Sequence, residues 1–141
     1  MSNSVNADDW NRRIIEEFRA NAGRVGGVFE GASMLLLHHR GARSGIERVN
    51  PLAYQPVAKG FAVFASKAGA PTNPDWYHNL KANPNVTIEV GTDTIAVAAE
   101  EARGEERDRL FGAQVERSPQ FADYQKNTNR VIPVMVLTPT G

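Results

Sequence analysis

Apolar residues recur with helical spacing near the start of the chain. Trp10, Ile14 and Phe18 stand four residues apart, so their side chains form one stripe along a helix. This pattern predicts a helix over residues 8–22. Gly23 suits its end, because glycine adopts the left-handed backbone that often terminates a helix. We expect the stripe to pack on the rest of the protein rather than on a membrane surface.

Beyond this helix, short apolar runs alternate with turn residues. They predict six strands, at residues 34–39, 47–55, 60–65, 85–90, 94–99 and 131–137. The first three should form an antiparallel meander, because their connections are too short for parallel crossovers. Helical segments are expected at residues 73–83, 104–117 and 118–126. Asn73 should cap the first of these, with Pro74 in its first position. The predicted class is α+β, with about six mainly antiparallel strands in a sheet or barrel.

The length of 141 residues suits one domain, which we place at residues 34–141 behind a helical, glycine-rich lead-in at residues 1–33. No apolar run approaches the roughly 20 residues of a membrane-spanning helix, and the polar start lacks the order of a secretory signal. These features predict a cytoplasmic protein without stable membrane insertion. The absence of cysteine excludes disulfides, thiolate catalysis and cysteine-ligated zinc.

Charge is balanced over the whole chain but not along it. Lysine and arginine together number 16, as do aspartate and glutamate, which argues against a nucleic-acid partner. Between residues 34 and 81, however, there are six basic residues and only two acids. A basic excess within a neutral chain favours a specific anionic small molecule. The alternative is scatter over a solvated surface.

The basic region includes a tight turn between two predicted strands, at residues 41–45. Such a turn can present backbone N–H groups to an anion, and Ser44 adds a hydroxyl donor. Arg43 and Arg48 can pair with phosphate or carboxylate. The spacing matches neither a Walker A loop nor the dinucleotide-binding glycine motif. The alternative is a plain hairpin turn with exposed arginines.

Later segments carry further candidate groups. The loop at residues 65–70 is built of small residues that let a flat ring approach the backbone, and Lys67 could neutralise charge there. Trp76 could wall a pocket, or it could simply pack its short helix on the sheet. The phenol of Tyr124 could bind a carbonyl substrate and relay a proton. Alternatively, Tyr124 and Phe121 form the core face of a short helix.

The three histidines do not form a metal-binding pattern. His38 and His39 are adjacent, so on a strand their side chains point to opposite faces. The chain has no spacing typical of zinc sites and no serine-hydrolase elbow. We therefore expect neither a metal site nor serine-hydrolase chemistry.

Taken in order, several segments resemble the deazaflavin-dependent nitroreductase family of actinobacteria, in particular its quinone and enone reductases. The resemblance covers most of the chain and rests on residues 17–27, the turn at 41–45 with the run at 48–52, the loop at 65–69 and the block at 73–84. It implies a split β-barrel related to the flavin-binding barrels, with an N-terminal helix and inserted short helices. The resemblance also implies the cofactor, the deazaflavin coenzyme F420.

The resemblance also implies an activity and a set of site residues. Reduced F420 would donate a hydride to a hydrophobic small molecule such as a quinone, an activated enone or a nitro compound. Carried over by position, the coenzyme-binding residues are Arg43, Ser44, Arg48, Asn50 and Pro51 on the phosphate side, and Ala65, Ser66, Lys67, Pro74 and Trp76 around the ring. Tyr124 is the implied catalytic residue, near the acceptor.

Some residues depart from the family pattern, and other functions stay open. Ala42 stands where many members carry arginine, while Ala53 and Phe121 replace tyrosines of the nitroimidazole-reducing members. These departures bear on the acceptor and leave the phosphate-side residues in place. An FMN-dependent reductase of the same barrel fold is one alternative, and a non-catalytic carrier of F420 or of a lipid-like ligand is another. The chain could act as a monomer or a homodimer.

Overall fold

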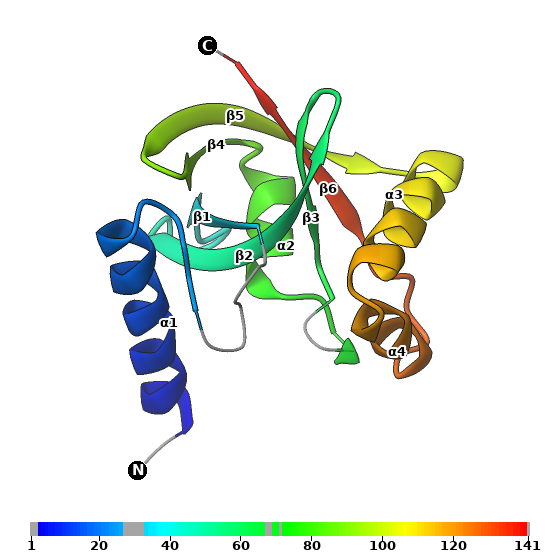
Figure 1. Ribbon diagram of the computed structural model, residues 1–141, viewed down its shortest axis with the longest axis horizontal. Coiled ribbons are helices and arrows are strands. Elements are labelled where there is room, and N and C mark those ends of the chain that lie inside the picture. Colours follow the sequence, from blue (N-terminus) through cyan, green and yellow to red (C-terminus); the bar gives the residue numbers. More distant parts are fainter. Residues whose placement is uncertain (1–2, 27–32, 67–68, 71, 141) are drawn as a thin grey trace.

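The computed structural model describes residues 3–26, 33–66, 69–70 and 72–140. Its helices are α1 (Asn3–Ala20), α2 (Asp75–Ala82), α3 (Gly104–Arg117) and α4 (Gln120–Lys126). Its strands are β1 (Met34–Arg40), β2 (Glu47–Val57), β3 (Gly60–Phe64), β4 (Asn85–Val90), β5 (Asp93–Ala102) and β6 (Val134–Pro139). Figure 1 shows the strands at the centre, with α1 on one side and the α3–α4 pair on the other.

The six strands form a closed antiparallel barrel in the order β1-β2-β3-β6-β5-β4, and β4 pairs back onto β1. The strands β1, β2 and β3 form the meander expected from their short connections. β6 lies between β3 and β5, so the last strand completes the barrel. The predicted α+β class, with an antiparallel barrel and inserted helices, is confirmed.

Side chains alternate between the inside and the outside of this barrel, as period-two strands require. Leu35 and Leu37 of β1 point into the interior, where they pack with Val63 of β3. Helix α2 closes one end of the barrel by inserting Trp76 and Leu80 into the same hydrophobic cluster. In this position, the first turn of α2 lies beside the hairpin that joins β1 to β2.

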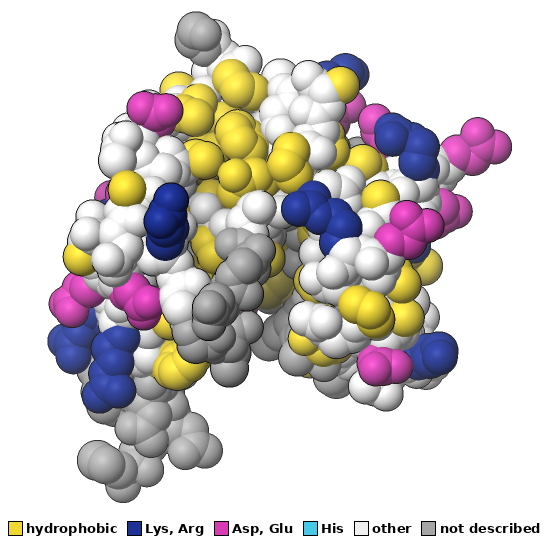
Figure 2. All heavy atoms as spheres, viewed as in Figure 1, with side chains coloured by type: hydrophobic (Ala, Val, Ile, Leu, Met, Phe, Trp, Pro, Cys, Tyr) yellow, Lys and Arg dark blue, Asp and Glu magenta, His cyan; other side chains and the backbone are white. Residues whose placement is uncertain are grey.

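Helices cover two separate parts of the outer barrel surface. Ile14 and Phe18 of α1 pack on Leu36 of β1. On the other side, α3 and α4 bury a group of aromatic and aliphatic residues against β3 and β6: Leu110, Phe111, Phe121, Phe64, Val134 and Val136. Figure 2 shows that charged side chains lie mainly over these helical flanks, whereas hydrophobic side chains gather between them in the upper half of the view.

Several details differ from the sequence prediction. α1 begins at Asn3, and only part of its apolar stripe is buried, because the Trp10 side chain is 49% exposed. β6 begins at Val134 instead of residue 131. The expected helix cap at Asn73 is wrong, because Pro74 occupies the N-cap position and no side chain caps α2. None of the described helices is both long and apolar enough to cross a membrane.

Candidate functional site

Three elements meet at the end of the barrel that α2 closes: α1, the first turn of α2, and the strands that flank the β1–β2 hairpin. A cavity of about 580 Å³ lies between them, within the roughly 300–1,000 Å³ typical of small-molecule sites. Four residues implied by the family resemblance line this cavity together: Arg48, Asn50, Pro74 and Trp76. Because they come from two distant segments, their convergence is a property of the fold and not of one motif.

Helix α1 forms a wall of the same cavity that the sequence did not indicate. Its Arg12, Ile15 and Arg19 line the space opposite the strands. With Arg48 they bring three guanidinium groups to a cavity whose lining contains one carboxylate, that of Asp75. Arg19 is paired with Glu89, which lies outside the lining. With Glu89 included, three guanidinium groups still face only two carboxylates, so the formal charge is positive and favours an anionic group on the ligand.

A buried histidine ties α2 to the two strands. His39 is 2% exposed, and its Nδ1 accepts a hydrogen bond from Asn79 Nδ2 at 2.9 Å. The proton must then reside on Nε2, which donates to Asn50 Oδ1 at 2.6 Å. Burial lowers the pKa of His39, although the bond to Asn50 opposes this shift. His39 is therefore a neutral imidazole that holds Asn50 at the cavity.

The other end of the Asn79 carboxamide orders the candidate anion-binding turn. Asn79 Oδ1 accepts a hydrogen bond from the Ala42 N–H at 2.9 Å. The turn is closed by the Gly45 N–H, which donates to the Gly41 carbonyl at 3.0 Å. Ser44 Oγ accepts from the Ile46 N–H at 3.2 Å.

Arg43 and Ser44 lie on this turn with exposed side chains, and neither is among the residues that line the 580 Å³ cavity. Their turn lies next to the cavity, because it joins two strands that line it. β1 carries His39, and β2 carries Arg48 and Asn50. The phosphate-side residues therefore divide into an outer pair on the turn and an inner pair on the strand.

An ion-pair network fixes α1 beside the cavity. Arg19 donates to both carboxylate oxygens of Glu89, from Nε at 3.1 Å and from Nη2 at 2.6 Å. His38 Nε2 donates to the same carboxylate at 2.6 Å. The Arg19 hydrogen bonds, aided by His38, lower the pKa of Glu89 to about 2. As expected for neighbours on a strand, His38 points outward to this network, whereas His39 points inward.

The ring-side residues lie where β3 ends. Ala65 is buried and Ser66 is half-buried, while Lys67 lies outside the described residues. The Ala65 N–H donates to the Pro133 carbonyl at 2.9 Å, so the strand direction continues one residue beyond β3. Pro51, the remaining phosphate-side candidate, is half-buried in β2.

Tyr124, the candidate catalytic residue, lies on α4. Its ring packs edge-on against Phe121, with 5.2 Å between ring centroids. It does not line the cavity beside α1. The α4 backbone instead approaches the ring-side loop at Gly69, where an added Cβ would lie 2.8 Å from the Tyr124 carbonyl oxygen. The structure therefore places Tyr124 beside the loop and not beside Arg48.

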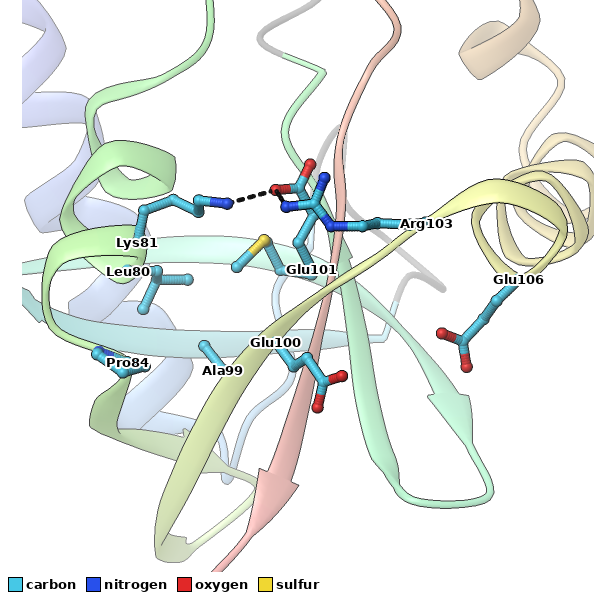
Figure 3. Close-up of a pocket in the computed structure, with 9 residues that line it drawn as sticks. Leu80, Lys81, Pro84, Ala99, Glu100, Glu101, Arg103 and Glu106 are labelled. Atoms are coloured by element: carbon cyan, nitrogen blue, oxygen red, sulfur yellow. Dashed lines mark hydrogen bonds and ion pairs between the residues drawn. The ribbon is translucent and has the colours of Figure 1, made fainter.

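A second cavity, of about 490 Å³, opens between α2, β5 and the start of α3 (Figure 3). Both of its basic residues are paired with one acid: Lys81 Nζ lies 2.8 Å and Arg103 Nη2 lies 3.6 Å from Glu101 Oε1, and Glu100 and Glu106 add two further carboxylates to the lining. The Tyr77 hydroxyl donates to the same oxygen at 2.9 Å. None of the residues implied by the resemblance lines this cavity. We therefore assign the candidate site to the cavity beside α1.

Comparison with known proteins identifies the family of this chain. Residues 10–139 match the family described as F420H(2)-dependent quinone reductase. The chain belongs to this family. A curated F420H(2)-dependent quinone reductase of Mycobacterium tuberculosis is 40% identical over 125 residues, which is 86% of this chain and 84% of that protein.

Two solved structures are similar over most of the fold. One, described as an F420-H2 dependent reductase, shares 39% identity at a TM-score of 0.68 and covers 74% of this chain and 93% of its own. Another, described as a domain-swapped dimer, shares 34% identity at a TM-score of 0.69 and covers 96% of this chain and 99% of its own. Family membership confirms the F420-dependent oxidoreductase and the F420 cofactor that the resemblance implied.

Sequence reasoning missed two contributors to the site. The hydrogen bonds of the neutral His39 were missed because only the pairing of β1 with β2 and the position of α2 show which way the ring faces. The polar side of α1, with Arg12 and Arg19, read as ordinary solvated surface. Neither contributor had a signal in spacing alone.

Proposed function

We propose that this protein binds reduced F420 in the cavity beside α1 and transfers the hydride to a flat hydrophobic acceptor of the quinone class. The observation that carries the proposal is the convergence of Arg48, Asn50, Pro74 and Trp76 on one cavity. These residues are the ones implied for the coenzyme by the family motifs. The acceptor class rests on the curated relative in M. tuberculosis, which is named a quinone reductase.

The residues present fit the coenzyme. Its phosphate and acidic tail need cationic and N–H donors, and the cavity and its approach offer Arg12, Arg48 and the exposed Arg43. The bond from the Ala42 N–H to Asn79 fixes the turn that carries Arg43. The shape of this turn is therefore set by the protein itself. A flat ring needs an apolar wall, which Pro74 and Trp76 supply.

When bound, reduced F420 supplies a hydride equivalent. The chain's own residues provide position and charge. Arg43 and Arg48 bind the anionic end, and the neutral His39 keeps Asn50 oriented toward the ligand. Trp76 excludes water from the inner side of the cavity because its side chain packs in the hydrophobic core of the barrel.

Tyr124 supplies the proton that follows the hydride onto a reduced carbonyl. Its ring is fixed against Phe121, and among the described residues its hydroxyl has no hydrogen-bond partner. A phenol without a partner in the protein can donate to an acceptor that lies beside the ring-side loop. Ala53 and Phe121 lack the hydroxyls of the nitroimidazole-reducing members, which favours an acceptor bound by apolar contact.

The first experiment is a titration of purified protein with F420 and, separately, with FMN, following ligand fluorescence and tryptophan quenching. Tight F420 binding with weak FMN binding supports the proposal. Oxidation of reduced F420 by a soluble naphthoquinone then tests turnover. Preference for FMN would transfer the chain to flavin chemistry, and tight F420 binding without any quinone turnover would identify a carrier instead of an enzyme.

A further inference from the structure

One arginine outside the cavity makes an unusually dense set of contacts with the loop that follows β3. Arg130 donates from Nη1 to the Ala65 carbonyl at 3.0 Å and from Nη2 to the Ser66 carbonyl at 2.8 Å. Its Nε donates to the Ala70 carbonyl at 3.0 Å. Its Nη1 also donates to Asn73 Oδ1 at 2.6 Å, which explains why that side chain does not cap α2. One planar guanidinium therefore binds four acceptors along a single loop.

The backbone of Arg130 is itself held by a side chain of α4. Gln125 Nε2 donates to the Arg130 carbonyl at 2.7 Å. Gln125 Oε1 in turn accepts from Arg107 Nη2 at 2.8 Å and from the Ile132 N–H at 3.1 Å. A continuous hydrogen-bonded chain therefore runs from α3 through α4 to the loop. Burial lowers the pKa of Arg130, but a guanidinium keeps its charge at any physiological pH.

These contacts fix the direction of one peptide group. In a trans peptide the C=O and the following N–H point in opposite directions, and the described residues contain no cis peptide. With the Ala65 carbonyl turned toward Arg130, the Ser66 N–H points away from Arg130. Among the described residues this N–H has no hydrogen-bond partner. The loop thus offers a backbone donor on the side away from Arg130.

The loop also lies directly on α4. Gly69 has φ +80°, and its N–H donates to the Ser66 carbonyl at 2.9 Å. An added Cβ at Gly69 would lie 2.8 Å from the Tyr124 carbonyl oxygen, so only glycine fits this contact. The loop and the helix that carries Tyr124 are therefore positioned as one unit, with Arg130 as the polar part of the junction.

We propose that Arg130 is the positioning residue that orients the loop after β3, so that the Ser66 N–H faces the coenzyme ring and the loop keeps a fixed distance from Tyr124. The inference deepens the proposed function and rests on it for the identity of the ring. Arg130 touches neither coenzyme nor acceptor in this assignment. It acts through the backbone of Ala65 and Ser66.

Two substitutions test the proposal, Arg130→Lys and Arg130→Gln, with Arg109→Lys as the matched control. Arg109 is an exposed arginine of α3 that lies outside the hydrogen-bonded chain from Arg107 through Gln125 to Arg130. The Arg130 variants should lose some thermal stability, and Arg109→Lys should not. Only the Arg130 variants should speed amide hydrogen exchange at residues 65–73 in the coenzyme-free protein, by about tenfold or more, because several charge-assisted bonds to that loop are lost.

Coenzyme readouts separate positioning from plain stability. In the folded Arg130 variants, the dissociation constant for F420 should rise about tenfold, and the absorption band of the bound coenzyme should shift toward that of free F420. Added guanidinium chloride at millimolar concentration should partly restore the affinity of Arg130→Gln and leave that of Arg109→Lys unchanged. Wild-type loop exchange and wild-type affinity in both Arg130 variants would overturn the proposal. Failure of the wild-type protein itself to bind F420 would overturn the proposed function and, with it, the ring-directed role of Arg130.

Discussion

The carboxamide of Asn79 accepts a hydrogen bond from the Ala42 N–H at 2.9 Å, so a buried residue of α2 determines the shape of an exposed turn between β1 and β2. The same carboxamide binds His39 at 2.9 Å. The β1–β2 turn and α2 are therefore coupled through one side chain, by a bond that joins residues 37 positions apart.

Replacing Asn79 with alanine should disorder the turn and leave His39 Nδ1 without its donor. We expect a loss of about 1–3 kcal/mol in the free energy of unfolding, because buried polar partners are left unsatisfied. F420 affinity should fall as well. Urea denaturation and coenzyme titration check both expectations, with the exposed Asn83→Ala as control. A variant with unaltered affinity would show that the turn does not contribute to the coenzyme site.

The cationic residues of the site should act on binding and not on the chemical step. Arg43→Ala and Arg48→Ala should each raise the F420 dissociation constant by about tenfold or more, since each removes a charge-assisted bond to the anionic end. Turnover at saturating coenzyme should change little. Arg109→Ala, an exposed arginine of α3, serves as control. If both site variants bind F420 like the wild type, the phosphate assignment is wrong.

His39 should make stability depend on pH. Burial lowers its pKa from the ordinary 6.5, so the folded state binds fewer protons than the unfolded chain just below that pH. The stabilisation of the folded state by neutral His39 is therefore complete above pH 6.5. It is lost as the pH falls from 6.5 toward the folded-state pKa of His39. In a protonated ring, Nδ1 would also carry a hydrogen. That N–H would face the Asn79 amide, so two donors would point at each other.

Thermal unfolding midpoints of the wild type and of His39→Gln, measured across this pH range, isolate the effect. The difference between the unfolding midpoints of the two proteins should shrink as the pH falls below 6.5. The glutamine variant keeps a hydrogen-bonding side chain but does not titrate. A pH-independent difference would mean that His39 does not exchange a proton on unfolding in this range.

The Glu89 network should stabilise the attachment of α1 at neutral pH. The Arg19 hydrogen bonds depress the pKa of Glu89 from 4.5 to about 2, so the stabilisation is present above pH 4.5 and is lost as the pH falls toward 2. Glu89→Gln should cost about 0.5–1 kcal/mol at pH 7, and less in molar salt. Chemical denaturation measures this, and Glu47→Gln, an exposed acid 3.9 Å from His38 Nδ1, should have almost no effect.

Tyr124→Phe tests the proton donor. If the phenol donates in turnover, the rate with a naphthoquinone should fall by about 10-fold to 100-fold, while F420 affinity stays constant. Tyr77→Phe is the control, because its hydroxyl is committed to Glu101. A solvent isotope effect on the wild-type rate that disappears in Tyr124→Phe would agree with this role. Equal rates in the two proteins would assign the proton to solvent.

Strong local patterns in the sequence predicted most of the fold and little of the site geometry. The helix at Gly104–Arg117 and the strand at Asn85–Val90 have the predicted bounds, because amphipathic spacing and turn residues define both locally. Asn73 shows the limit of local reasoning. Its sequence position matches a helix cap, but Arg130, far along the chain, captures its side chain.

The same limit applies to α1. Its apolar stripe predicted a packed helix, and Ile14 and Phe18 are indeed buried. Trp10 is half exposed because α1 extends past the barrel surface that covers its later turns. That Arg12 and Arg19 would line a cavity depends on where the helix docks, which tertiary packing decides.

The position of β6 determines when the barrel can close as the chain leaves the ribosome. Residues Val134–Pro139 pair with β3 on one side and β5 on the other, so both neighbours keep open edges until the last strand emerges. Every residue that lines the cavity beside α1 has been synthesised by Trp76, yet the barrel beneath it is incomplete for nearly half of translation. Unpaired strand edges invite pairing with other chains. Nascent or truncated forms that lack β6 should therefore depend on chaperones and aggregate on release.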